Sequence, residues 1–337
     1  MLQLAIEIGS YSIKGLAQDS IKGKMEKHTI EIPSWCAFED NDSDGNVYLG
    51  HAAKMCRLKG FAYQISYLEN PDESFRRIIR KVVCDLIEWA NHWFPNAPVY
   101  SVHFLVPMYY KENNPLIEDM RQVADSLGFK KVFFIPAHIA LCKSQAEVNN
   151  RETVLVYDLG YRGLTVSLLR KMNYSNYELV CPSVFLADCA GKQIDSELMK
   201  DLLRDNPISD LSTMMLLEDT TVYLKEFISI HQQCRCVIPG TNFFSLIDRN
   251  VFNDKITPIV TKSLTFTRDF INELTEPPTA VLLWGGTSRL PIVKNRFLYL
   301  ANELNLPTVI TDCSRYEGSP FYALEGSLIA DGTFVDL

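Results

Sequence analysis

The sequence lacks long apolar runs and lacks an excess of positive charge. Its 337 residues carry a formal net charge of -8. This charge argues against a nucleic-acid partner, whose binding surface needs a basic patch. No apolar stretch is long enough to span a bilayer, and the N-terminus has neither the basic region nor the long apolar region of a signal peptide. We therefore expect a cytoplasmic protein with no nucleic-acid and no membrane partner.

The sequence also lacks any C-x-x-C pair, although it contains nine cysteines. Scattered cysteines without paired spacing favour buried, reduced thiols over a zinc site or a disulfide framework. Hydrophobic residues make up 47% of the chain and charged residues 22%, which is a normal globular balance. The length is more than one compact core usually holds, so we expect two lobes.

The hydrophobic pattern predicts an α/β protein in which a strand hairpin followed by a helical crossover occurs twice. The first hairpin is expected at 4–8 and 12–17, and the second at 153–157 and 165–169. Further strands are expected at 99–107, 131–135, 234–238, 242–246, 280–284 and 308–310. Helices are expected at 75–93, 115–127, 137–147, 191–203, 216–228, 253–274, 291–304 and 320–330.

Three glycine turns combine with small hydroxyl or charged residues. The first is EIGSYSIK (7–14), the second is DLGYRGLT (158–165), and the third is GGTSRLP (285–291). Glycine at such turns lets backbone N–H groups approach a phosphate closely. Two acid-Gly hairpins could hold a triphosphate, with Glu7 and Asp158 near magnesium and the attacking water. Each turn alone is commonplace, but their order is informative.

The third turn lies between a buried strand and a helix. Gly285 and Gly286 would permit close approach of a nucleoside, and Arg289 could stack on its base. Lys14, in the first hairpin, could reach a phosphate or could be a solvated strand residue. We find no serine-histidine-acid arrangement and no metal-ligand spacing around the isolated histidines.

These motifs resemble the actin, sugar kinase and heat-shock chaperone superfamily, and most of all the ATPase domain of the 70-kilodalton heat-shock chaperones. VLLWGGTSRLPIVK (281–294) is very close to the adenosine motif of that family, and LVYDLGYRGLTVSLL (155–169) is similar to its second phosphate loop. Further similarity lies in LAIEIGSYSIKGLA (4–17), YLGHAAK (48–54), residues 104–141 and GKQIDSELM (191–199), so it covers nearly the whole chain.

The resemblance implies an actin-like ATPase fold, with two ribonuclease-H-like lobes and ATP or ADP with Mg²⁺ in the cleft between them. It implies lobe I at 1–150, lobe II at 151–310, and a C-terminal helix at 311–337 returning to lobe I. Glu7 and Asp158 are the implied catalytic acids and contact magnesium through water. The implied nucleotide-binding residues are Gly9, Ser10, Tyr11, Lys14, Gly160, Tyr161, Arg162, Gly163, Gly191, Lys225, Gly285, Gly286, Thr287, Ser288 and Arg289.

The chain departs from the family on the phosphate side. Glu7 replaces an aspartate and is one methylene longer, which could displace the magnesium-water geometry by ~1 Å. Tyr161 and Arg162 occupy a turn that is usually glycine-rich, so Tyr161 could crowd the phosphates or Arg162 could supply positive charge. Thr165 stands where an aspartate is expected.

Two departures lie outside these turns. Pro136-Ala137 replaces a glutamate-proline pair in the connecting segment. Lys225 resembles the lysine that contacts base and ribose, but Val222 stands in place of its glutamate partner. ATP binding is therefore expected to survive while hydrolysis is weak or impaired.

The expected function is that of a chaperone-type ATP-binding domain, a possible weak ATPase whose lobe closure is read by a co-chaperone or by a peptide-binding domain absent from this chain. A filament-forming actin-like ATPase of the plasmid-segregation type is one alternative. A pseudo-ATPase scaffold that binds no nucleotide is another.

Overall fold

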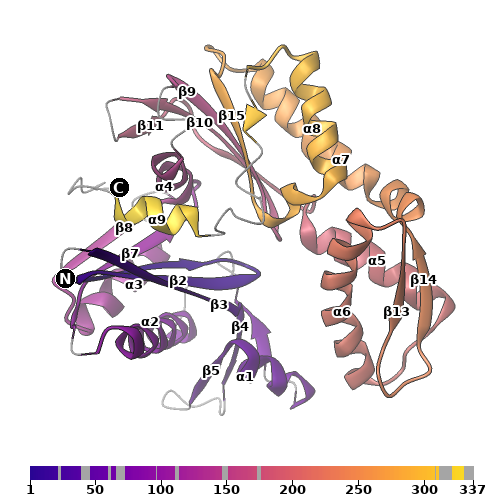
Figure 1. The fold of residues 1–337 in the computed structure, drawn as a ribbon, viewed down its shortest axis with the longest axis horizontal. Coiled ribbons are helices and arrows are strands. Elements are labelled where there is room, and N and C mark those ends of the chain that lie inside the picture. The colour runs from indigo at the N-terminus through magenta and orange to yellow at the C-terminus, as the bar shows by residue number, and fades with distance from the viewer. Residues whose placement is uncertain are drawn as a thin grey trace. The chain divides into compact units, whose positions relative to one another are not determined.

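The computed structural model (Figure 1) describes residues 1–21, 24–38, 46–59, 62–65, 73–95, 97–110, 114–145, 151–172, 176–307, 309–310 and 321–329. Its contacts divide the chain into two compact units. Unit 1 comprises Met1–Asn150, Met172–Glu178 and Ser319–Leu337, and unit 2 comprises Arg151–Lys171 and Leu179–Gly318. No helix in the described ranges combines the length and the apolar character needed to cross a membrane.

Unit 1 is built on a five-stranded sheet. The strands are β1 (Leu2–Ile8), β2 (Ser12–Ile21), β3 (Lys24–Pro33), β7 (Val99–Val106) and β8 (Lys131–Pro136), in the order β3-β2-β1-β7-β8. β1, β2 and β3 are antiparallel, whereas β1, β7 and β8 run parallel. Parallel neighbours need a crossover, and helices α2 (Glu73–Trp93) and α3 (Pro115–Ser126) supply it.

Helices cover the unit 1 sheet (Figure 1). Buried α2 residues such as Ile79, Val82 and Leu86 share one hydrophobic core with β1 and β7. Helices α4 (Ala137–Ser144) and α9 (Tyr322–Leu328) cross so closely that a Cβ on Gly326 would lie 1.7 Å from the Ala140 carbonyl oxygen. Only glycine permits this approach of two helix backbones.

A second, three-stranded sheet follows β3 in unit 1. It has the order β5-β4-β6, with β4 at Trp35–Phe38, β5 at Val47–Leu49 and β6 at Ala62–Gln64. Helix α1 (Gly50–Met55) and a 3₁₀ turn at Cys56–Lys59 lie between β5 and β6. Our sequence prediction missed these short elements and β3.

Unit 2 repeats the strand arrangement. Its sheet has the order β11-β10-β9-β15-β16, and β12 also pairs with β10. β9 and β10 are antiparallel, whereas β9, β15 and β16 are parallel. The bounds are β9 Thr153–Leu159, β10 Gly163–Lys171, β11 Tyr177–Leu179, β12 Val184–Ala187, β15 Ala280–Trp284 and β16 Val309–Ile310.

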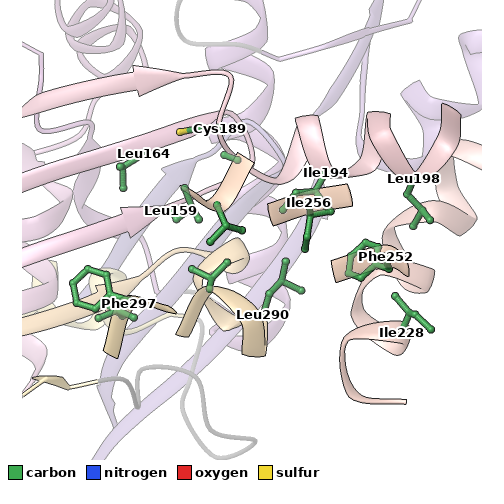
Figure 2. Packing of buried hydrophobic residues seen from close by; sticks show 14 of the residues in the cluster. Leu159, Leu164, Cys189, Ile194, Leu198, Ile228, Phe252, Ile256, Leu290 and Phe297 are labelled. Atoms are coloured by element: carbon green, nitrogen blue, oxygen red, sulfur yellow. The ribbon is translucent and has the colours of Figure 1, made fainter. Parts of the chain in front are cut away.

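The helices of unit 2 are α5 (Gly191–Asp205), α6 (Leu211–Ile230), α7 (Arg249–Asn272) and α8 (Pro291–Glu303), and the hairpin β13 (Gln233–Val237)–β14 (Phe244–Asp248) lies between α6 and α7. One apolar core joins them (Figure 2), and in it Leu159, Ile194, Ile228, Phe252 and Phe297 are buried. The N-cap side chains Asp210 and Asp248 accept bonds from the first N–H groups of α6 and α7.

The predicted α/β class is confirmed, and within the described residues the predicted helices and strands are confirmed with shifts of a few residues at their ends. Residues 146, 147, 308, 320 and 330 of the predicted ranges lie outside the described residues. The larger shifts lengthen the hairpin strands and α6. The eight cysteines that lie within the described residues are all free thiols.

Candidate functional site

The first glycine turn, between β1 and β2 in unit 1, is closed by its own backbone and held from the end of β3. The Gly9 N–H donates to the Ser12 carbonyl oxygen at 2.9 Å, and the Ser34 hydroxyl donates to the Gly9 carbonyl oxygen at 2.6 Å. The Ser34 N–H donates to the Tyr11 carbonyl oxygen at 2.9 Å. Gly9 and Ser10 are half-buried, and Tyr11 is exposed.

The acid of the first turn is neutralised within its own hairpin. Glu7 and Lys14 are direct cross-strand partners, and Lys14 Nζ lies 3.2 Å from Glu7 Oε2. Both side chains are partly buried. Lys14 is therefore not a freely solvated lysine. Any contact of its ammonium with a phosphate would have to be shared with Glu7.

The second glycine turn, in unit 2, joins β9 to β10. The Gly160 N–H donates to the Gly163 carbonyl oxygen at 3.0 Å, which closes the turn. A Cβ on Gly163 would lie 2.5 Å from the Leu186 carbonyl oxygen, so only glycine fits there. Asp158, Tyr161 and Arg162 are half-buried around this turn.

Three sequence motifs meet at one atom, the carbonyl oxygen of Gly160. It accepts the Thr287 hydroxyl at 2.7 Å and the Gly191 N–H at 3.2 Å. The next N–H of α5, that of Lys192, donates to the Tyr161 carbonyl oxygen at 2.7 Å. Because the first N–H groups of a helix have no intrahelical acceptor, the second turn satisfies two of them. The second turn, the start of α5 and the 285–289 turn thus form one cluster, which we call the Gly160 cluster.

Gly285 presses directly against the end of β9. Its φ is +88°, and a Cβ there would lie 2.3 Å from the Leu159 carbonyl oxygen and 2.5 Å from Asp158 Oδ1. A 3₁₀ turn (η3, Gly286–Arg289) follows, in which the Ser288 hydroxyl donates to the Gly285 carbonyl oxygen at 2.7 Å. Thr287 and Ser288 are buried, whereas Gly286 and Arg289 are exposed.

Lys225 lies on α6 in a buried ion pair. Its Nζ lies 2.6 Å from Asp195 Oδ1 on α5, and both side chains are about nine-tenths buried, with 9% and 10% exposed. Burial raises the pKa of Asp195, while the charge of Lys225 opposes that rise. No partner for Asp195 Oδ2 is found among the described residues. Lys225 Nζ also lies 6.0 Å from the ring centroid of Tyr161.

Sequence reasoning missed Asp195, because it sought the partner of Lys225 on the same helix, at Val222. The sequence of α5 nevertheless carried a usable signal, which is the helical spacing of its apolar residues. Gly191, Ile194, Leu198 and Leu202 are buried at helical spacing, and Asp195 lies on that same face. A carboxylate at an apolar position of a helix predicts a buried cation partner.

The structure therefore brings together most of the expected site residues within unit 2. Gly160, Gly163, Gly191 and Gly285–Arg289 belong to the Gly160 cluster, Asp158 lies against it at Gly285, and the Tyr161 ring extends from it toward Lys225. Glu7, Gly9, Ser10, Tyr11 and Lys14 lie together on the β1–β2 hairpin of unit 1. Within the described part of the chain, no three His, Cys, Asp or Glu side chains gather into a metal site.

No family model matches the chain. Among curated proteins, the chain is similar to the heat shock 70-related protein 5 of Dictyostelium discoideum, with 23% identity over 315 residues. The aligned region covers 86% of this chain and 57% of that protein, so the chain spans little more than half the length of this relative. The similarity supports a distant relationship to the 70-kilodalton heat-shock family.

Proposed function

We propose that the chain is an adenine-nucleotide-binding protein with an actin-like ATPase fold, in which units 1 and 2 are the two ribonuclease-H-like lobes. The shared strand order of the two main sheets supports this fold, as do the matching directions of β2-β1-β7-β8 and β10-β9-β15-β16. The distant similarity to a heat shock 70-related protein supports a chaperone-type role over the other uses of the fold.

The Gly160 cluster is the observation that carries the proposal. The proposed phosphate turn, the start of α5 and the proposed nucleoside turn are far apart in the sequence, yet the carbonyl oxygen of Gly160 in the first accepts a bond from each of the other two. Gly163, Gly191 and Gly285 leave no room for a side chain at these junctions. The proposed nucleoside side is formed by Gly285 to Arg289 with Lys225, and the proposed phosphate side by Gly160 to Gly163.

Hydrolysis is proposed to be weak. Glu7 is longer than an aspartate by one methylene and is paired with Lys14 at 3.2 Å. A carboxylate that already has a cation partner is a poorer base and a poorer ligand for a metal-bound water. Because a displacement of about 1 Å can slow a reaction about a hundredfold, binding is expected to outlast catalysis.

The donors present fit a magnesium ion that arrives with the nucleotide. Mg²⁺ keeps several waters and is usually held by one or two carboxylates together with phosphate oxygens. The carboxylate oxygens of Asp158 in unit 2 are of this hard type, as are those of Glu7 in unit 1, and each carboxylate is proposed to act through water. When bound, the ion would neutralise phosphate charge. The residues themselves position the phosphates through the backbone of the turns.

We further propose a cytoplasmic location and a partner, either a co-chaperone or a peptide-binding domain, that responds to the nucleotide state. The chain spans 57% of its heat shock 70-related relative, which leaves room in that relative for a further region. A nucleotide shifts a conformational equilibrium only through its different affinities for the two states. A partner that binds one of these states more tightly would therefore respond to the bound nucleotide.

Calorimetric titration with ATP and ADP, each with and without Mg²⁺, tests the binding proposal. We expect adenine nucleotides to bind and single-turnover hydrolysis to be slow. Saturable binding with rapid hydrolysis would contradict only the impaired catalysis. No heat and no competition at millimolar nucleotide would contradict the binding function itself. ATP-dependent light scattering at high protein concentration would instead favour the filament alternative.

A further inference from the structure

Tyr161 is a bulky residue in a turn that is proposed to hold phosphate, so its side chain must be kept out of the way. Its ring is directed toward the start of α5, because a Cβ on Gly191 would lie 3.2 Å from Tyr161 Cδ2. Its carbonyl oxygen accepts the Lys192 N–H at 2.7 Å. The backbone and the ring of Tyr161 are thus both attached to the helix side of the turn.

The ammonium of Lys225 is a polar neighbour of this ring. Lys225 Nζ lies 6.0 Å from the ring centroid, within the range at which a cation is attracted to an aromatic face. That attraction strengthens when the cation is withdrawn from water, and only 9% of the Lys225 side chain is exposed. A buried lysine has several rotatable bonds, so something must fix its ammonium beneath the ring.

Asp195 is placed to fix it. Asp195 Oδ1 lies 2.6 Å from Lys225 Nζ, and Asp195 stands one helical turn after Gly191, against which the ring packs. The carboxylate is itself buried, so loss of its charge would leave Lys225 without a compensating anion. The order of contacts is therefore Asp195 to Lys225 to the Tyr161 ring.

We infer that Asp195 is a positioning residue: through Lys225 it holds the Tyr161 side chain against α5 and keeps the Gly160–Gly163 turn open to phosphate. This inference rests on the proposed function. It explains how a turn that carries tyrosine in place of glycine can still serve as a phosphate loop. In this inference Asp195 does not touch the phosphate and acts on it through Lys225 and Tyr161, which distinguishes it from a residue that binds the nucleotide directly.

Rescue by a second substitution tests the inference. Asp195→Asn keeps the shape of the side chain and removes its charge, so the Tyr161 ring would enter the turn for most of the time. If only a tenth of the molecules stay competent, the affinity for Mg-ADP falls about tenfold. Tyr161→Gly removes the ring that needs holding. The double variant Tyr161→Gly/Asp195→Asn should then bind Mg-ADP within about twofold of Tyr161→Gly alone.

The matched control is Asp201→Asn. Asp201 lies on the same helix and also pairs with a lysine, Lys255, but it is far along α5 from Tyr161. It should leave the Mg-ADP affinity unchanged. Urea unfolding of each protein checks folding, and if Asp195→Asn does not fold, Asp195→Ser with the same Tyr161→Gly rescue replaces it.

The outcomes separate the inference from the proposed function. An unchanged affinity in Asp195→Asn overturns the inference while the proposed function stands. A loss that Tyr161→Gly does not rescue also overturns it, because Asp195 would then act directly on the ligand or on folding. Absence of Mg-ADP binding in the unaltered chain overturns the proposed function, and the inference falls with it.

Discussion

The β1–β2 and β9–β10 hairpins occupy the same place in two sheets of the same strand order, yet their turns are held in different ways. Among the described residues, the first turn is held by its own Gly9–Ser12 backbone bond and by the hydroxyl and N–H of Ser34, and its acid is paired with Lys14 of the same hairpin. The second turn is held by the start of α5 and by Thr287 at the Gly160 carbonyl oxygen. A common topology therefore fixes where a turn lies without fixing what that turn can do.

The difference predicts where substitutions are tolerated. In the first turn, a Cβ on Gly9 would meet only the Ser12 carbonyl oxygen, at 3.0 Å. In unit 2, a Cβ on Gly163, Gly191 or Gly285 would lie within 2.7 Å of another atom. The Gly160 cluster is thus a rigid junction, whereas the first turn is a hairpin with local pairing.

The largest effect is expected from Gly285→Ala. The substituted Cβ would overlap the Leu159 carbonyl oxygen at 2.3 Å, and alanine disfavours a φ of +88°. We expect unit 2 to lose about 3 kcal/mol or more of unfolding free energy, as for other severe backbone clashes. Urea unfolding followed by tryptophan fluorescence measures it.

Gly286→Ala is the control for Gly285→Ala, because a Cβ there meets nothing within 4 Å. It should change the unfolding free energy by less than about 1 kcal/mol. Equal losses of unfolding free energy in the two variants would contradict the distinction between a tightly packed junction at Gly285 and an ordinary turn at Gly286.

The second effect is acid destabilisation of unit 1. Burial lowers the pKa of His103 from 6.5 to about 4. The Nδ1 of its imidazole lies 2.9 Å from the Ser327 carbonyl oxygen. The unfolded chain therefore binds a proton at a higher pH than the folded chain. Stability from this group is complete above pH 6.5 and falls by about 3 kcal/mol as the pH drops toward 4.

His103→Gln should flatten this pH dependence of the unfolding free energy, while His51→Gln, at an exposed position on α1, should not. Asp195 in unit 2 has the opposite effect on the unfolding free energy. Burial raises its pKa in the folded state, so its protonation favours the folded state as the pH falls. An unchanged slope in His103→Gln would contradict the buried neutral imidazole.

A smaller effect is expected from Thr287→Val, which removes the hydroxyl bond to the Gly160 carbonyl oxygen and keeps the side-chain shape. A buried hydrogen bond of this kind contributes about 1 kcal/mol, and Gly160 retains the Gly191 N–H as a donor. Thr220→Val on α6, where the hydroxyl bonds within its own helix, is the control. Thermal unfolding should shift only for Thr287→Val.

The smallest effect on stability is expected from Lys14→Met. The pair with Glu7 is partly exposed, so its loss should cost about 0.5 kcal/mol. In the absence of Mg²⁺, the affinity for ATP should nevertheless fall about tenfold, because an unpaired Glu7 would repel the phosphates. Lys27→Met, which breaks the looser 3.7 Å pair with Glu325 in the same unit, should leave that affinity unchanged.

Much of the fold could be predicted because its signals are local. The 153–157 run is apolar on both faces, as in a strand buried inside a sheet, and the 75–93 segment has clear helical spacing. β4, β5 and β6 escaped prediction because strands of three or four residues carry too few alternations. Their stability comes from tertiary packing, which a local pattern does not contain.

The candidate site was predictable only in part, for a similar reason. Glycines between a strand and a helix marked the 285–289 turn in the sequence. The Asp195–Lys225 pair links positions thirty residues apart on two helices, and nothing in the sequence specifies that distance. Likewise, the sequence left open which way Tyr161 points, because a side-chain direction depends on what packs against it.

A crystal structure of the chain grown with Mg-ADP tests the central claim most directly, because it locates the ligand on named atoms. We predict nucleotide density against the Gly160–Gly163 turn, with the nucleoside beside Gly285–Arg289 and the Tyr161 ring against α5. Density at another place, or an empty Gly160 cluster at saturating Mg-ADP, would contradict the claim that this cluster is a nucleotide site.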